Sequence, residues 1–411
     1  MAKTNAPTLP LVKGGLALWQ VPGFKCGAAY AGLKRRKPGV LDVGVLWAPE
    51  GATAAAVFTT NQACAAPVNW SRKVAARGRA SAAVMNSGNA NACTGPRGEK
   101  DAAEMAAVAA RALGVRAEEV FVASTGVIGH PLDMAKVRAG LWEAAIEATG
   151  PGRAKFERAI MTTDLVQKRA ACRVKIAGKT VTVAGVTKGS GMISPNVATM
   201  LAYIATDAAV EAKTLRAALN WCADRSFNCL TVDGQGSTND SVFLMASGAS
   251  GAKIKRPAGG DYAKFLAALE AVCRDLARQI ARDGEGATKL VTVNVTGARN
   301  EADARAAARA VADSMLVKCA LFGCDPNWGR ILSAIGMSSA KLDPAKARVE
   351  VGGVKVYDRK PLEFSPKAAK KALSVKELDL NVDLRLGSGQ ATFYTCDLTY
   401  GYVKINAEYH T

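Results

Sequence analysis

The chain has 411 residues, of which 49% are hydrophobic, and a formal net charge of +19 at pH 7. This composition is typical of a globular protein with two or three domains or one large two-lobed core, and it excludes a disordered chain. No apolar stretch approaches the roughly 18 to 20 residues of a membrane span, and the first residues lack the apolar core of a signal peptide. We therefore expect a cytoplasmic protein that does not bind membranes.

A charge of +19 is also typical of proteins that bind nucleic acids. The distribution argues against that function, because the basic residues are dispersed along the chain. The one basic run, Lys34–Lys37, has the pattern of a solvated turn without aromatic neighbours on which bases could stack. We predict no nucleic-acid partner, and a positive field also suits small dianionic substrates.

The sequence contains no motif for a metal or a nucleotide cofactor. The ten cysteines form no CxxC pair, and two histidines cannot complete the usual mixed zinc sites. There is no P-loop, and no Rossmann glycine motif follows a predicted strand. We therefore predict reduced cysteines, most of them buried, no metal and no cofactor.

In chain order, strands and helices alternate and also cluster. Apolar runs between turn residues predict strands at 41–47, 54–59, 81–86, 119–124, 171–176, 180–187, 200–206, 241–248, 290–297, 347–351 and 380–386, with one or two more in 391–405. Amphipathic patterns predict helices at 66–77, 98–113, 133–149, 152–160, 209–224, 260–282, 300–317, 327–337 and 366–373. This mixture predicts a layered α/β or α+β fold with mixed sheets sandwiched by helices. The last residues follow a strand-like run, so we expect the C-terminus to be tied down and not frayed.

Thr199 is the most informative residue of the chain, because it lies between a turn rich in glycine and an apolar strand. If the Ala198–Thr199 peptide bond breaks, the new α-amino group can accept the proton of the Thr199 hydroxyl. No histidine is then needed, and a serine–histidine–acid triad has only His130 and His410 to draw on. The local sequence alone favours the simpler interpretation, a glycine-rich turn before a buried strand.

The segment Lys188–Asp207 resembles the processing site of the ornithine acetyltransferase (glutamate N-acetyltransferase) family. The resemblance extends along essentially the whole chain. Further matching segments are 85–92, 124–129, 161–164, 233–234, 283–289 and 325–330.

The resemblance implies a self-processing enzyme of arginine biosynthesis with an N-terminal-nucleophile-like fold. Cleavage would give segments 1–198 and 199–411, which stay intertwined because each supplies strands to a common core. By resemblance the two chains assemble as an α2β2 heterotetramer. The implied reaction is a ping-pong acetyl transfer from N2-acetyl-L-ornithine to L-glutamate, with ornithine and N-acetylglutamate as products.

The resemblance also assigns roles to particular residues. Thr125 and Gly126 follow a predicted buried strand, where a turn would let a hydroxyl and a backbone N–H hold an oxyanion. Glu285 lies between two glycines and suits the cationic side chain of ornithine. Thr162 matches the substrate-binding threonine of the family, and Thr163 is the alternative for that role. Asp164, which follows them, fits an orienting or capping role better than acid catalysis. The implied substrate-binding residues are Thr162, Lys188, Thr199, Glu285, Asn406 and Thr411.

Three alternatives stay open. Some members of the family also take the acetyl group from acetyl-CoA, and nothing in this sequence separates the two behaviours. The same nucleophile with water as acceptor would make an N-terminal-nucleophile hydrolase, such as an aminopeptidase or amidase. A basic binding protein without catalysis is the third, and it would not be cleaved.

Overall fold

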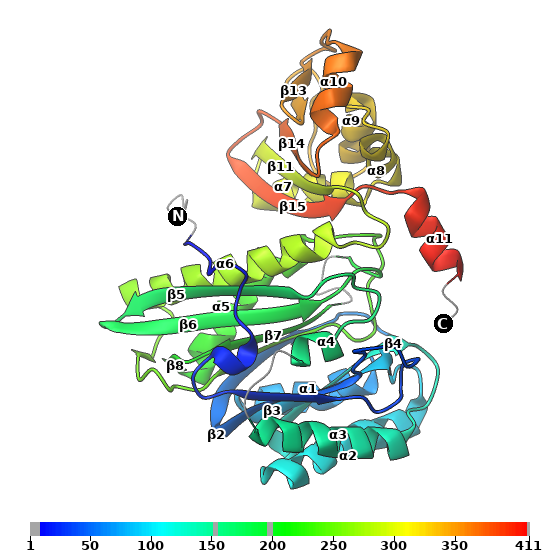
Figure 1. The fold of residues 1–411 in the computed structure, drawn as a ribbon. Coiled ribbons are helices and arrows are strands. Elements are labelled where there is room, and N and C mark those ends of the chain that lie inside the picture. Colours follow the sequence, from blue (N-terminus) through cyan, green and yellow to red (C-terminus); the bar gives the residue numbers. More distant parts are fainter. Residues whose placement is uncertain (1–8, 151–154, 195–199, 409–411) are drawn as a thin grey trace.

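The computed structural model describes residues 9–150, 155–194 and 200–408 and contains a large sheet-rich part and a smaller part above it (Figure 1). The predicted site residues Ala198, Thr199 and Thr411 lie outside the described residues. The mixed α/β architecture with helices flanking the sheets confirms the predicted fold class.

The large part is built on an eight-stranded sheet with the order β4-β3-β2-β9-β7-β6-β5, in which β1 also pairs with β2. A two-stranded parallel sheet, β8 with β10, lies beside it. The strands are β1 Lys25–Ala29, β2 Val43–Phe58, β3 Arg79–Asn89, β4 Val120–Val127, β5 Lys168–Ile176, β6 Lys179–Lys188, β7 Leu201–Thr206, β8 Ala209–Val210, β9 Ser241–Ala246 and β10 Lys253–Ile254.

Strand β2 divides the sheet into two leaves. Its residues 43–47 pair with β1 and β3, a register shift follows Trp47, and residues 53–58 pair with β9. The prediction of two separate strands at 41–47 and 54–59 was wrong, because the irregularity bends one strand without ending it. The first leaf contains β1, β3 and β4, and the second contains β9, β7, β6 and β5.

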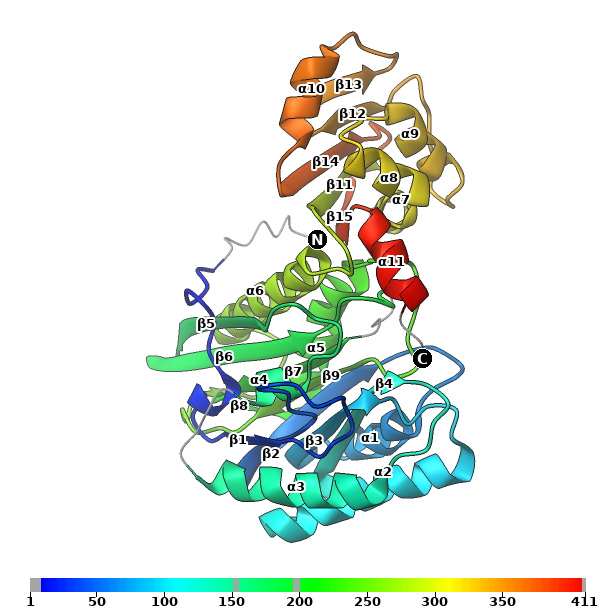
Figure 2. The same cartoon turned by 45° about the vertical axis from the view of Figure 1, so that its right-hand side comes forward.

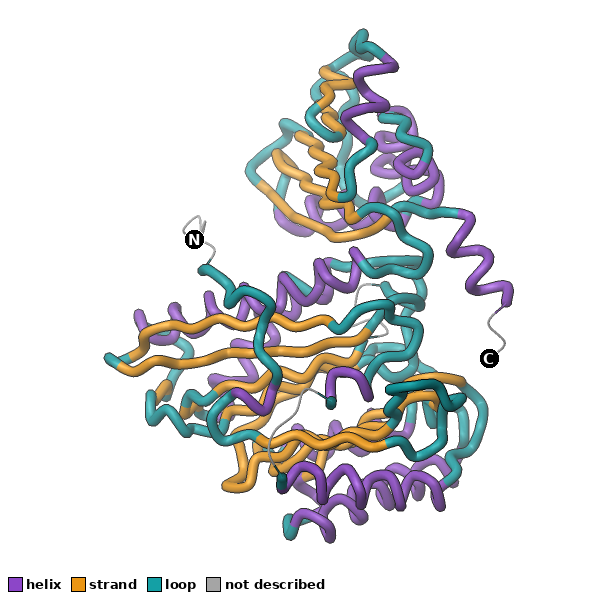
Figure 3. Tube along the Cα trace, viewed as in Figure 1, coloured by secondary structure: helices purple, strands orange, loops and turns teal. Residues whose placement is uncertain are grey.

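The two leaves face each other across an apolar core. Phe121 of the first leaf packs against Phe243 of the second with ring centroids 4.8 Å apart, and Tyr203 lies 5.3 Å from Phe243. Because side chains alternate along a strand, each leaf has a second apolar face, which helices cover. The result is four layers, helix–sheet–sheet–helix, visible in Figure 3.

Helices α2 and α3 cover the first leaf, α1 packs against β4, and α5 and α6 cover the second leaf. The helices of this part are α1 Ala66–Ala76, α2 Gly95–Leu113, α3 Met134–Thr149, α4 Phe156–Ala159, α5 Ala212–Asp224 and α6 Gly260–Arg282, with short 3-10 turns η1 Leu18–Gln20, η2 Ala117–Glu119 and η3 Phe227–Cys229.

The smaller part lies beyond α6 and has its own apolar core (Figure 2). Its five-stranded sheet has the order β13-β12-β14-β11-β15. The strands are β11 Leu290–Ala298, β12 Arg348–Val351, β13 Val354–Asp358, β14 Glu377–Asp383 and β15 Gly389–Cys396, and the helices are α7 Glu301–Asp313, α8 Met315–Phe322, α9 Trp328–Gly336 and α10 Pro366–Leu373. The predicted helix 300–317 is divided at Ser314, whose side chain caps α8.

The C-terminal segment corrects a second prediction. The expected strand run 391–405 ends at Cys396, and Tyr400–Glu408 forms helix α11, none of whose residues is buried. A helix satisfies its own backbone hydrogen bonds, so this segment needs no sheet edge to pair with. The C-terminal residues described here are therefore held by a few side-chain contacts and not by a strand.

Strands from before and after residue 198 alternate in the same sheet. Strand β9 lies between β2 and β7, and β7 pairs with β6 as well. Residues 1–198 and 199–411 thus both supply strands to this one sheet.

Candidate active site

The predicted site residues that the structure describes lie near the two ends of segment 195–199. Lys188 ends β6, Met200 precedes β7, and Leu201 of β7 pairs with Lys188 in the sheet. Lys188 is 3% exposed. Burial and the neighbouring Lys168 lower its pKa, and Asp164, Asp240 and Glu285 oppose that shift. The cation predicted from the motif thus sits, buried, among three carboxylates.

Thr125 and Gly126 lie near the end of β4, and Thr125 is buried. The strand continues to Val127, so the turn expected here is absent, and the pairing of β4 with β3 becomes irregular at this point. Gly126 has φ +133°, and a Cβ built there would lie 2.3 Å from the carbonyl carbon of Gly88. Only glycine fits, because real Cβ atoms are never that close to backbone.

Asn239 connects this strand end to the site. Its side-chain amide donates to the carbonyl oxygens of Ser124 (2.9 Å) and Ala90 (2.6 Å), and it is buried. The neighbouring residue Asp240 accepts from the backbone N–H of Met200 at 2.9 Å. Adjacent residues of one loop thus hold both the Thr125 strand and the start of β7.

Asp164, Lys168 and Asp283 form a buried ion-pair cluster. The Lys168 ammonium lies 2.7 Å from Asp164 Oδ1 and 2.5 Å from Asp283 Oδ2. Asp164 also accepts from the backbone N–H groups of Thr162 (3.0 Å) and Gly189 (2.7 Å). This carboxylate therefore ties the predicted substrate residue Thr162 to the turn after Lys188.

The charge state of Asp164 follows from these contacts. Burial alone would raise its pKa, but Lys168, Lys188 and the Gly189 N–H outweigh burial and lower the pKa to about 2. An acid that is ionised at neutral pH has no proton to give. The geometry fits the orienting role expected for Asp164.

Glu285 and Asn406 come together although 121 residues separate them. The Asn406 side-chain amide donates to Glu285 Oε2 at 2.9 Å, and the Glu285 backbone N–H donates to the Ser190 carbonyl at 3.0 Å. A Cβ at Gly191 would collide with the Glu285 carboxylate. Helix α11 thus places Asn406 beside Glu285, and both predicted substrate-binding residues lie next to the loop that leads into residue 195.

Asp233 holds that loop from the other side. It accepts from the backbone N–H groups of Met192 (2.6 Å) and Ile193 (2.9 Å) and from the Tyr402 hydroxyl (3.2 Å). Burial raises the pKa of Asp233, although these hydrogen bonds oppose the shift. Two carboxylates therefore hold the residues that flank segment 195–199, the half-buried Asp233 on Met192 and Ile193 and the buried Asp240 on Met200.

Sequence reasoning missed several residues of this neighbourhood, among them Asn239, Lys168, Lys34 and Asp240. Lys34 was read as part of a solvated turn, but its ammonium donates to the carbonyl oxygens of Met161 (2.7 Å) and Leu41 (2.9 Å). Burial lowers the pKa of Lys34 to about 8. Asp240 belonged to none of the motifs recognised in the sequence. Only the fold brings these residues to the site.

Other predictions concern residues away from this cluster. The ten cysteines are free, and six of them are buried. Among the described residues, no group of histidine, cysteine or carboxylate side chains could hold a metal ion. No helix in the described part of the chain is long and apolar enough to cross a membrane.

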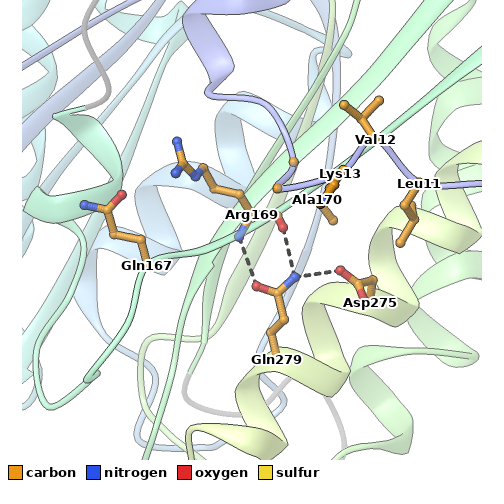
Figure 4. A pocket seen from close by; sticks show the side chains of 10 residues that line it. Leu11, Val12, Lys13, Gln167, Arg169, Ala170, Asp275 and Gln279 are labelled. Atoms are coloured by element: carbon orange, nitrogen blue, oxygen red, sulfur yellow. Dashed lines mark hydrogen bonds between the residues drawn. The ribbon is translucent and has the colours of Figure 1, made fainter.

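A pocket of about 410 Å³ lies between the N-terminal segment, the start of β5 and α6. Figure 4 shows Gln279 of α6 reaching across to β5, where its side chain pairs with both backbone groups of Arg169 (3.1 and 2.9 Å). None of the predicted site residues lines this pocket. It is a separate feature, one residue along β5 from Lys168.

Comparisons with known proteins agree along almost the whole chain. A model of the ArgJ family matches residues 25–411. The arginine biosynthesis bifunctional protein ArgJ of Symbiobacterium thermophilum is 50% identical over 390 residues, which cover 95% of this chain and 97% of the relative. The protein of the same name from Listeria monocytogenes serotype 4b is 44% identical over 98% of this chain and its own full length.

One solved structure is the ornithine acetyltransferase of Mycobacterium tuberculosis in complex with ornithine. It is 38% identical to this chain, with a TM-score of 0.41, over 46% of this chain and 98% of its own.

Proposed function

Because the chain belongs to the ArgJ family, we propose that it is a cytoplasmic glutamate N-acetyltransferase of arginine biosynthesis. It would take the acetyl group from N2-acetyl-L-ornithine and give it to L-glutamate. One observation supports this substrate class above all. A buried cation, Lys188, and a paired carboxylate and amide, Glu285 with Asn406, lie around the same loop. An α-amino acid with a basic side chain has the complementary charges, a carboxylate for Lys188 and an ammonium group for Glu285.

The nucleophile in this proposal is Thr199, freed by cleavage of the Ala198–Thr199 bond. Its α-amino group takes the hydroxyl proton, and the oxygen attacks the acetyl carbonyl of the substrate. The Thr125 hydroxyl and the Gly126 N–H hold the resulting oxyanion. The irregular pairing of β4 with β3 at Gly126 supports this role, since backbone groups outside a regular ladder are available to a ligand.

The cycle closes by transfer to a second amine. Ornithine leaves with the proton held by the Thr199 amine, and an acetyl-threonyl ester remains on the enzyme. The amine of glutamate then attacks the ester, and Thr199 recovers its proton as N-acetylglutamate leaves. The two amino acids would bind in turn at the same site, to Thr162, Lys188, Glu285, Asn406 and Thr411.

Substitution of the nucleophile tests the proposal. The Thr199→Ala variant should remain one uncut chain on a denaturing gel and should transfer no acetyl group, whereas the wild type should give two bands of similar size. Normal cleavage and turnover in the variant would reject the scheme. Product analysis with and without glutamate separates the transferase from a hydrolase, because a hydrolase would release acetate at an undiminished rate without glutamate.

A second activity is suggested by the word bifunctional in the names of the relatives. We propose that acetyl-CoA can serve as an alternative acetyl donor, with no bound cofactor. The assay is formation of N-acetylglutamate from acetyl-CoA and glutamate by the pure protein. For the assembled enzyme we propose an α2β2 heterotetramer, which light scattering of the cleaved protein would measure.

A further inference from the structure

Lys34 is a half-buried lysine that the proposed mechanism does not use, in the loop between β1 and β2. Its ammonium group donates to the carbonyl oxygens of Met161 (2.7 Å) and Leu41 (2.9 Å) and makes a longer contact with that of Ala159 (3.5 Å). An ammonium group has three donors and no acceptor, so three carbonyl oxygens use its full capacity. The side chain is therefore committed to backbone groups and not to solvent.

The peptide unit between Met161 and Thr162 is held from both sides. Lys34 holds its carbonyl oxygen, and the carboxylate of Asp164 accepts from its N–H at 3.0 Å. A peptide unit is planar, and its plane includes the Cα atoms of both residues. Because both polar groups of this unit are fixed, the direction in which the Thr162 side chain leaves the backbone depends on Lys34 and Asp164 together.

The loop that carries Lys34 is itself fixed by a buried carboxylate. Asp42 accepts from four consecutive backbone N–H groups, those of residues 31–34, at distances of 2.5 to 3.1 Å. The backbone carbonyl of Asp42 accepts from the N–H of Ser87 in β3 at 2.8 Å. The backbone of Lys34 is thus fastened to the first leaf of the sheet.

The stem of Lys34 lies beside the strand ends to which the proposed oxyanion donors belong. A Cβ built on Gly88 would lie 3.0 Å from Cγ of Lys34. Gly88 pairs with Gly126 in the sheet, and a Cβ on Gly126 would overlap its backbone. Gly88 is therefore adjacent to both residues, and Lys34 connects this strand end to the peptide unit before Thr162.

Charged groups from three other segments act on Lys34. Burial has the largest effect and lowers its pKa to about 8; Lys188 at the end of β6 also lowers it, whereas Asp42 before β2 and Asp164 before β5 oppose the shift. The ammonium form makes charge-assisted hydrogen bonds, which are the stronger kind. That form predominates below pH 8 and is lost as the pH rises above it.

Resting on the proposed function, in which Thr162 binds the substrate, we infer that Lys34 is a positioning residue for Thr162. Its ammonium group and the Asp164 carboxylate clamp the 161–162 peptide unit and so set the position from which Thr162 binds the amino acid. Lys34 touches no reacting atom in this role, and no covalent bond to it forms or breaks.

The test is a double-mutant cycle of Lys34→Met with Thr162→Val. Methionine keeps the apolar stem of Lys34 without its donors, and valine keeps the shape of Thr162 without its hydroxyl. The matched control is Lys37→Met, which makes the same change in net charge at an exposed position of the same basic run. Purified full-length proteins are assayed for melting temperature and for kcat and KM of acetylornithine from pH 7 to 9, with rates expressed per cleaved chain.

At pH 7 we expect Lys34→Met to raise KM about tenfold and to change kcat less than about threefold. Loss of uniform binding raises KM alone, and one hydrogen bond is worth up to about tenfold. In the Thr162→Val background Lys34→Met should raise KM less than about twofold, because both changes then act on one contact. Lys37→Met should keep the KM of the wild type.

The pH dependence gives a second reading. The ratio of KM in Lys34→Met to KM in the wild type should fall from pH 7 to pH 9, because only the wild type has an ammonium group to lose in this range. Effects of pH on the substrates and on other groups are common to both proteins and cancel in the ratio.

Four results would each overturn the inference. They are a wild-type KM in Lys34→Met at pH 7, a wild-type KM in Thr162→Val, an equal effect of Lys34→Met with and without the Thr162 hydroxyl, and a KM ratio that stays constant with pH. An equal effect in both backgrounds would mean that Lys34 has a general structural role only.

If Lys34→Met does not accumulate in soluble form, Lys34→Arg takes its place. A guanidinium group stays protonated throughout this range, so KM in Lys34→Arg should rise less between pH 7 and pH 9 than KM in the wild type does. A KM that follows the wild type at every pH would overturn the inference too. Failure of the proposed function looks different, because the wild-type protein itself would then transfer no acetyl group.

Discussion

Lys168 and Asp164 form an ion pair of 2.7 Å in which neither side chain is accessible to solvent. The same ammonium also pairs with Asp283, so one cation neutralises two buried carboxylates that come from separate parts of the chain. Removing it would leave both carboxylates buried without their cation.

We predict that Lys168→Met destabilises the protein by about 3 to 5 kcal/mol, the usual loss when a buried pair loses one partner. Urea unfolding of the variant measures this free energy. The control is Lys175→Met on the same strand, where the lysine is exposed and the change should be below about 0.5 kcal/mol. Equal stability of the two variants would show that the cluster is not important for folding.

The pKa of Asp164 predicts how stability responds to acid. Its folded pKa of about 2 lies below the ordinary value of 3.8, so the ionised form is stabilised in the folded protein. That contribution, about 2 kcal/mol, is fully present at neutral pH and is lost as the pH falls from about 4 toward 2.

The measurement is the difference in free energy of unfolding between the wild type and Asp164→Asn. We expect this difference to shrink steadily from pH 5 to pH 3. A difference that stays constant with pH would contradict the assignment of the low pKa to Asp164.

Thr125→Ala should lower kcat by about 10²- to 10³-fold if the hydroxyl donates to the oxyanion. KM should change little, since the contact is made to charge that develops during the reaction. Steady-state kinetics with acetylornithine and glutamate give both constants. An unchanged kcat would remove this hydroxyl from the mechanism.

Gly126→Ala should be damaging for two reasons that a control can separate. The residue has φ +133°, and the added methyl group would overlap the backbone of Gly88 and Asn89. The control is Gly129→Ala. Gly129 has φ +88° with no atom within 4 Å of a built Cβ, so this variant has the backbone strain without the steric overlap.

That strain amounts to about 1 to 3 kcal/mol. We expect Gly126→Ala to lower the melting temperature further than Gly129→Ala does and to abolish transferase activity. Similar melting temperatures for the two variants would show that β3 can move aside without loss.

Local patterns predicted the fold class and the boundaries of most helices. Helix α9, for example, begins after Asn327, whose side chain accepts from the Arg330 N–H at 3.0 Å, as a capping residue does. Local sequence patterns failed to predict strand boundaries where pairing with neighbouring strands determines them. Strand β2 continues through its bend because β3 pairs with it on both sides of the irregularity and β9 pairs with it from Thr53 on, and no local signal records those neighbours.

The site residues also fall into two groups, those found through local motifs and those that only the fold brings to the site. Lys188 and Glu285 were found through motifs, and the fold then placed them in one neighbourhood. Lys34 was lost in a basic run that looked solvated, although its ammonium is directed at backbone carbonyls. Asp240 is one aspartate among many in sequence, and its contact with Met200 depends on the parallel pairing of β7 with β9.

The position of β9 between β2 and β7 also bears on the order of events in the cell. If the backbone is cut before β7, the downstream piece on its own would present β7 and β9 without β6 and β2, and exposed strand edges of that kind promote aggregation. Assembly of the sheet must then come before scission. A folding defect anywhere in the four layers would therefore be visible as unprocessed precursor, and maturation would act as a checkpoint for correct folding.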